Sequence, residues 1–105
     1  MNTANTDQIK AFLQNLAEKA MTVLEHGNIV GARYNACICG MWQETAKTKL
    51  GVGFDPFLKI EIPHPDSNNQ DAILKFTLLK KGLGDLKSWF LTGQIASKLA
   101  RRNVT

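Results

Sequence analysis

The chain has 105 residues and a formal net charge of +4, and 44% of its residues are hydrophobic against 21% charged. This length suits a single domain, and this composition excludes a disordered or collagen-like chain. No apolar run approaches the roughly 20 residues that a membrane-spanning helix needs, and the first residues lack the pattern of a secretory signal, so we expect neither membrane insertion nor secretion.

The first predicted element is an amphipathic helix over residues 7–26. Thr6 is suited to cap its N-terminus, and Gly27 is suited to the left-handed conformation that follows a last helical turn. The apolar residues that define the helix recur at steps of three and four, and they are Ile9, Phe12, Leu13, Leu16, Ala20, Val23 and Leu24.

Residues 29–43 are predicted to form a strand. A helix over residues 35–47 is the alternative, but Gly40 and the Cys37–Cys39 run count against it, because glycine weakens helices and the run favours strands. The strand is favoured by an alternation of apolar with polar or small residues, in which the apolar set is Tyr34, Ala36, Ile38 and Trp42.

Three further segments alternate in the same way and are also predicted to be strands. Asp55-Pro56 marks a tight connection between the first two, and the polar residues 63–71 form a long loop before the third. The apolar sets of the three strands are Leu50, Val52 and Phe54; Leu58, Ile60 and Ile62; and Leu74, Phe76 and Leu78.

The last predicted element is a second helix from about Asp85 to Arg102, which begins after Gly82 and Gly84 interrupt the chain. The element order is therefore α-β-β-β-α, with a fourth strand if residues 29–43 are extended.

This order predicts an α+β fold, a single two-layer domain over residues 1–105 with both helices packed on one face of an antiparallel sheet. We expect flexible ends at residues 1–5 and 103–105. The expected core comprises Phe12, Leu16, Leu24, Leu58, Ile60, Leu74, Phe76, Leu78, Trp89 and Phe90.

The charge is distributed unevenly along the chain. From Lys75 onward there are seven basic residues and one acid, Asp85, whereas the residues before Lys75 include six basic and eight acidic ones. On the second helix, Lys87, Lys98, Arg101 and Arg102 fall within an arc of about 100°, and Trp89 lies opposite them. A basic C-terminal third of this kind favours an anionic partner.

We predict that this basic surface contacts nucleic-acid phosphates, because clustered lysine and arginine side chains release condensed counterions from a nucleic-acid backbone. The choice between DNA and RNA stays open, and an acidic protein surface is the alternative partner. The candidate nucleic-acid-binding residues are Lys80, Lys81, Lys87, Lys98, Arg101 and Arg102.

The second functional hypothesis is a protein-interaction module: an adaptor, a chaperone or an inhibitor of the type encoded by phages or plasmids. If the apolar sets of the predicted sheet face the helices, Ile73 and Leu79 lie on its outer face, and exposed apolar residues mark interfaces. We therefore name Ile73 and Leu79 as the candidate interaction surface, for a partner protein or for a second copy of the chain in a homodimer.

Catalysis, metal binding and cofactor binding are not expected. Cys37 and Cys39 have neither the spacing nor the second pair that zinc sites use. His64 and its neighbouring aspartates belong to a polar loop, and no second group is placed to orient them. We predict a protein that is not an enzyme, with reduced cysteines, in the cytoplasm.

Overall fold

The structure, a computed structural model, describes residues 3–66 and 68–104. Within these residues the chain contains helices and no strand, so the predicted α+β fold with an antiparallel sheet is wrong. The flexible ends predicted at the termini fall partly on residues 1, 2 and 105, which lie outside the described residues. The helical elements are α1 (Thr3–Glu25), α2 (Ile29–Leu50), the 3₁₀ turn η1 (Pro56–Lys59) and α3 (Gln70–Val104).

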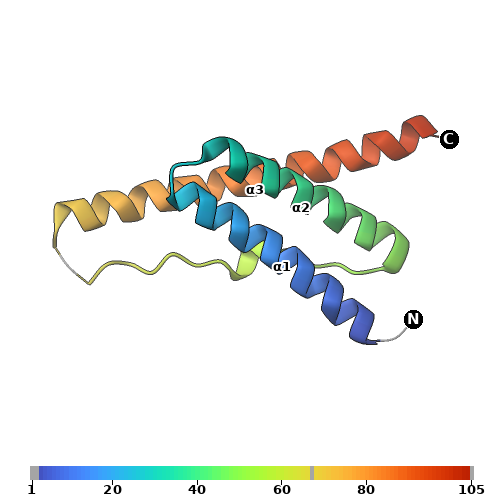
Figure 1. Cartoon of the computed structure of the whole chain (residues 1–105), viewed down its shortest axis with the longest axis horizontal. Coiled ribbons are helices and arrows are strands. Elements are labelled where there is room, and N and C mark those ends of the chain that lie inside the picture. The colour runs from blue at the N-terminus through green and yellow to red at the C-terminus, as the bar shows by residue number, and fades with distance from the viewer. Residues whose placement is uncertain (1–2, 67, 105) are drawn as a thin grey trace.

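The helices form an elongated bundle with principal-axis extents of 54 × 31 × 16 Å. α1 and α2 form an antiparallel hairpin, and α3 crosses behind it along the whole long axis (Figure 1). Residues 51–66 run back along the hairpin toward the end at which α3 begins, and both ends of α3 extend beyond the hairpin. α3 packs mainly on α2.

α1 confirms the predicted N-terminal helix, although it begins at Thr3 rather than after Thr6. Gly27 has a φ of 83°, which is the predicted left-handed conformation. Asn28 then caps α2, because its side-chain oxygen accepts a hydrogen bond from the backbone N–H of Gly31 at 2.8 Å. This short turn therefore ends one helix and starts the next.

α2 replaces the strand predicted over residues 29–43 and extends beyond the alternative helix at 35–47. The alternation in the sequence did not predict which side chains are buried, because Tyr34 and Trp42, both assigned to the apolar strand face, are exposed. The buried positions instead follow helical steps of three and four, and they include Ala32, Asn35, Ala36, Cys39, Gln43 and Ala46.

Two glycines explain how closely α2 and α3 approach each other. A Cβ atom at Gly40 would overlap the backbone carbonyl oxygen of Phe90, and one at Gly93 would overlap the carbonyl oxygen of Cys37. The two backbones are therefore in direct contact at the crossing, and a larger residue would push them apart. Gly40, which counted against a helix in the sequence, is what allows this helix to pack.

The two strands predicted between Leu50 and Ile62 are wrong. Leu50 is the last residue of α2, and η1 follows at Pro56–Lys59. The Asp55 carboxylate accepts a hydrogen bond from the backbone N–H of Phe57 at 2.9 Å and so caps η1. The Phe57 side chain is fully buried, and its ring centroid lies 5.3 Å from that of Phe90. This contact holds the connecting segment on the bundle.

The third predicted strand and the second predicted helix belong to one helix. α3 begins at Gln70, so residues 74–78 are helical, and Gly82 and Gly84 lie within α3 instead of interrupting the chain. A glycine inside a helix costs about 1 kcal/mol relative to alanine. At Gly82 this cost is offset by packing, because the side chain of Leu24 occupies the space that a Cβ atom would need.

The core lies where the three helices meet η1. Among the predicted core residues, those buried in it or packed against it are Leu16, Leu24, Ile60, Trp89 and Phe90. Four others are exposed, contrary to the prediction: Phe12, Leu58, Leu74 and Leu78. The buried core consists of Leu13, Ala17, Ala20, Met21, Ala32, Ala36, Cys39, Phe57, Leu86 and Phe90.

Candidate interaction surface

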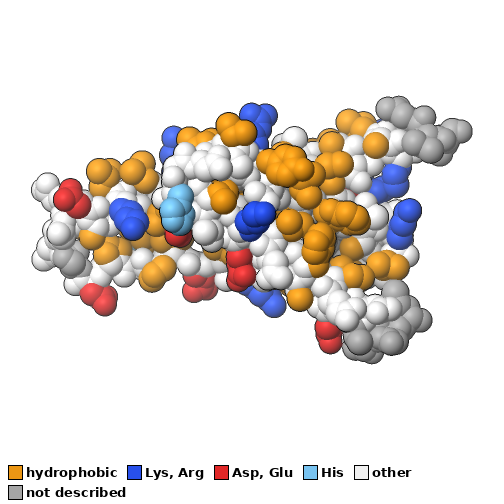
Figure 2. Space-filling model, viewed as in Figure 1, with side chains coloured by type: hydrophobic (Ala, Val, Ile, Leu, Met, Phe, Trp, Pro, Cys, Tyr) orange, Lys and Arg blue, Asp and Glu red, His pale blue; other side chains and the backbone are white. Residues whose placement is uncertain are grey.

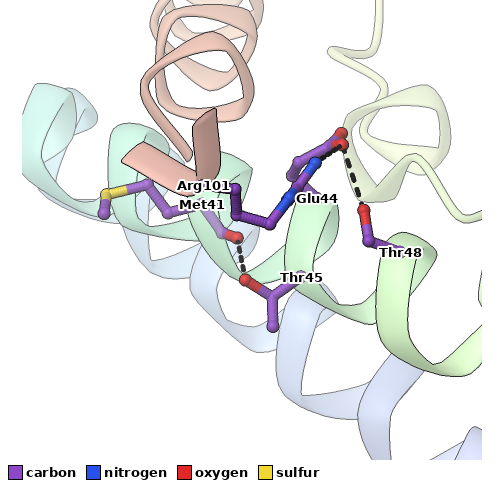
Figure 3. Close-up of polar contacts among 5 residues, drawn as sticks. All are labelled: Met41, Glu44, Thr45, Thr48 and Arg101. Carbon is purple, nitrogen blue, oxygen red and sulfur yellow. Dashed lines mark hydrogen bonds and ion pairs between the residues drawn. The ribbon is translucent and has the colours of Figure 1, made fainter. Parts of the chain in front are cut away.

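The six basic residues predicted to bind nucleic acid all lie on α3, but they do not share one surface. The guanidinium of Arg101 reaches α2, where it meets Glu44 (Figure 3). The other five have exposed side chains, and they are Lys80, Lys81, Lys87, Lys98 and Arg102.

The Arg101 contact is an ion pair between two helices. Its Nη2 donates a hydrogen bond to Oε1 of Glu44 at 2.9 Å, and the Glu44 side chain is only 5% exposed (Figure 3). The hydroxyl of Thr48 donates to the same oxygen at 3.3 Å. Because a carboxylate with so little exposure needs a partner, Arg101 is engaged inside the molecule and fastens the end of α3 to α2.

The environment of Glu44 favours its charged form. Burial alone would raise the pKa of this carboxyl group. The hydrogen bonds from Arg101 and Thr48 and the nearby charge of Lys98 outweigh burial, and they hold the pKa below its ordinary value of 4.5. Lys98 therefore supports this ion pair as well as contributing to the outer surface.

Three of the exposed lysines form a line along α3. At about 100° per residue, Lys80, Lys87 and Lys98 fall within about 20° of one another, and the helical rise spreads them over about 27 Å. The ammonium of Lys80 lies 5.4 Å from the ring centroid of Phe76. Glu61 lines the same shallow hollow as the first two lysines, so the line is not purely cationic.

The structure does not bring Ile73 and Leu79 together. Two residues that are six positions apart on a helix point in directions about 120° apart. Ile73 is 42% exposed, whereas Leu79 is half-buried and packs against the core in a hollow that Met21 also lines. Only Ile73 of this predicted pair is a surface residue.

The apolar surface of α3 was not predicted from the sequence. Figure 2 shows apolar side chains along the upper edge of the molecule, over both ends of this helix. Its signal in the sequence is a spacing of four residues between leucines and isoleucine, which at residues 74–78 also fits the alternation of a strand. The large apolar side chains that are 48–60% exposed on α3 are Leu74, Leu78, Leu91, Ile95 and Leu99.

A second apolar surface is a groove between α1 and α2, with a volume of about 470 Å³. Ile9, Phe12, Trp42 and Leu50 are among the residues that line it, and apolar side chains gather between the two helices in Figure 2. The rings of Phe12 and Trp42 meet edge to face with centroids 5.7 Å apart, and about half of each side chain is exposed.

Among the described residues, no three histidine, cysteine, aspartate or glutamate side chains are grouped to hold a metal ion. The Cys39 thiol is buried and donates a hydrogen bond to the carbonyl oxygen of Leu13 at 3.5 Å. Burial, and secondarily the charge of Asp55, raise its pKa to about 12, so this thiol stays protonated.

Comparisons of the chain with protein-family models, curated proteins and solved structures found no match. Throughout residues 3–66 and 68–104, no helix is both long and apolar enough to cross a membrane. The function therefore has to be inferred from the surface of the molecule.

Proposed function

We propose that this chain is a non-catalytic protein-interaction module. The observation that carries the proposal is the extent of apolar surface, because fourteen large hydrophobic side chains are exposed among the described residues. Single exposed apolar residues are ordinary, but contiguous ones mark interfaces. On α3 they are contiguous, since Leu91, Ile95 and Leu99 follow one another at steps of one helical turn.

The composition of the core supports the same proposal. Four of its residues are alanines, and its fully buried large apolar side chains include Leu13, Phe57 and Leu86. Most of the leucines of α3 lie outside the core. Such a distribution, with small residues between the helices and large ones facing solvent, is expected when another protein completes the burial.

The location we propose is a reducing cytoplasm. Both cysteines are free, Cys37 half-buried and Cys39 buried. Free thiols persist in a reducing compartment, which supports this location.

The proposal is tested by photo-cross-linking in the cells that normally express the protein. A benzophenone side chain is placed at Ile95, on the outer face of α3, and at Leu58, which is 72% exposed on η1, as the matched control. We expect protein adducts from position 95 and far fewer from position 58. Equal labelling at both positions, or adducts that nuclease removes and protease does not, would overturn the proposal.

Contact with nucleic-acid phosphates is a second candidate function, favoured by the exposed line of Lys80, Lys87 and Lys98. A protein that makes about three phosphate contacts should lose roughly 40-fold in affinity between 50 and 200 mM salt. In gel shifts on DNA and RNA, Lys87→Glu should reduce the salt slope by about one, whereas Lys49→Glu on α2 should not. No binding at low salt, or equal effects of the two substitutions, would exclude this function.

A further inference from the structure

The single chain exposes more surface than a compact protein of its mass. Its accessible area is 7141 Å², whereas about 5,800 Å² is typical of an 11.6-kDa monomer. The Cα radius of gyration is 15.6 Å, against about 13 Å for a compact domain of this length. The excess of about 1,300 Å² per chain matches what each partner buries in the larger, obligate homodimers.

The outer face of α3 carries a seam with the spacing that helix pairs use. Its positions follow one another at alternating steps of three and four residues, and all of them are exposed. The seam consists of Asp71, Leu74, Leu78, Lys81, Asp85, Ser88, Thr92, Ile95, Leu99 and Arg102. The seam is apolar near both ends, at Leu74 and Leu78 and again at Ile95 and Leu99, and polar in between. Those four side chains are 48–60% exposed.

The seam is symmetric about a point between Leu86 and Lys87. If a second α3 lies antiparallel to the first across this point, Leu74 faces Leu99 of the other copy and Leu78 faces Ile95. The same register places Asp71 opposite Arg102 of the other copy, so opposite charges meet at each end. A two-fold interface must be complementary to itself in this way, with the same patch contributed by both chains.

The polar centre of the seam favours the antiparallel arrangement. In a parallel pair in register, Lys81 would face Lys81 and Arg102 would face Arg102, and like charges in contact are unfavourable. In the antiparallel pair, Lys81 faces Thr92 of the other copy. The end of the seam also has room for a partner, because Leu74, Leu78 and Ile29 line a hollow of about 450 Å³.

We propose that a second copy of this chain covers the outer face of α3, in an antiparallel two-fold pair centred between Leu86 and Lys87. The inference rests on the proposed function, since it names the protein that the apolar surface binds. Each copy inserts Ile95 and Leu99 beside Leu78 and Leu74 of the other, which removes from water four of the large apolar side chains that α3 leaves exposed.

The first test is the mass of the full-length chain in solution, measured by sedimentation equilibrium over a range of concentrations. We expect twice the chain mass of 11.6 kDa for the wild type and for Leu58→Glu, a control on η1. Leu78→Glu should be monomeric at the same concentrations with an unchanged far-ultraviolet dichroism spectrum. A monomeric wild type, or a Leu78→Glu chain that remains dimeric, would overturn the inference.

The second test distinguishes the two orientations. Leu78→Cys and Ile95→Cys chains are prepared separately and oxidised alone or after mixing, with the wild type as the control for the native cysteines. In the antiparallel pair the two copies of position 78 lie about 25 Å apart, too far for a disulfide. We therefore expect cross-linked dimers only when the two variants are mixed, and none when either variant is oxidised by itself. Cross-linking of Leu78→Cys by itself would show a parallel pair and contradict the inference.

These results also separate this inference from the proposed function. If the wild type is monomeric but position 95 still forms adducts with another protein, the homodimer is wrong and the interaction module stands. If the chain is monomeric and position 95 forms no protein adduct, both fail.

Discussion

The ion pair between Glu44 and Arg101 joins residues that lie far apart in the sequence and on different helices. The carboxylate is almost fully buried, whereas 38% of the Arg101 side chain is exposed. Removing one partner of such a pair is costly because the other charge stays where water cannot solvate it well. The pair therefore contributes more to the α2–α3 contact than a surface salt bridge would.

Arg101→Ala should lower the free energy of unfolding by about 2–3 kcal/mol, somewhat less than for a fully buried pair, because water reaches part of this site. Lys98→Ala, which removes an exposed cation from the same end of α3, should cost less than about 1 kcal/mol. Urea unfolding at pH 7 measures both values. Equal losses would show that the hydrogen bond to Glu44 contributes nothing specific.

The same pair should make stability depend on pH. The folded pKa of Glu44 lies below its ordinary value of 4.5, so its contribution is present above about pH 4.5 and is lost as the pH falls through the folded pKa. Glu44→Gln cannot titrate, and its stability should fall less on acidification than that of the wild type. Urea midpoints measured from pH 7 to pH 3 check this, and parallel curves would contradict it.

At the scale of the elements, the crossing of α2 and α3 determines the architecture. The backbones touch at Gly40 and Gly93, where neither helix has a side chain to separate them. Two side-chain contacts join the neighbouring residues of α3 to the rest of the bundle: the ring of Phe90 packs on that of Phe57, and the guanidinium carbon of Arg33 lies 6.0 Å from the ring centroid of Trp89. The crossing is therefore the point least able to accept added volume.

Gly40→Ala should destabilise the protein by about 2–3 kcal/mol or more, because the added methyl group meets a backbone carbonyl that cannot rotate away. Gly84 is the matched control, since it lies within α3 and a Cβ atom there meets nothing within 4 Å. Gly84→Ala should stabilise by about 0.5–1 kcal/mol. Thermal unfolding of the two variants shows whether each substitution lowers or raises the stability. A Gly40→Ala variant as stable as the wild type would show that the helices are not in backbone contact.

At the scale of the whole molecule, the segment that follows α2 packs η1 onto the bundle that the crossing of α2 and α3 has formed. This segment contacts the bundle through η1, which lies against α1, and the buried ring of Phe57 packs on Phe90 of α3. The buried amide of Gln43 secures the start of the segment by donating a hydrogen bond to the carbonyl oxygen of Val52 at 2.9 Å. A long irregular connection is thus held by a few specific contacts.

Phe57→Ala should cost about 3–5 kcal/mol, as expected for a fully buried aromatic side chain. Its neighbour Leu58 is 72% exposed, and Leu58→Ala should change stability by less than about 0.5 kcal/mol. Hydrogen exchange should show the Phe57→Ala variant losing protection in both α1 and α3. Similar effects of the two substitutions would mean that η1 is not anchored by this ring.

The sequence by itself determined the N-terminal helix, the turn at Gly27 and the exposure of Lys87 and Lys98. These depend on local information: a 3.6-residue period sustained over twenty residues, a glycine that tolerates positive φ, and charges that cannot be buried unpaired. The second predicted helix, from about Asp85 to Arg102, is indeed helical, and its apolar period extends from Leu86 to Ala100.

Only the tertiary structure decided the rest. A five-residue alternation such as that of residues 74–78 fits either a strand or a helix, and the outcome depends on what covers it. The penalties for Gly40 and Gly82 in a helix, about 1 kcal/mol each, were outweighed by close packing that no local pattern reveals. Arg101 likewise looks the same as Arg102 in the sequence, and it differs only because α2 places a buried carboxylate beside it.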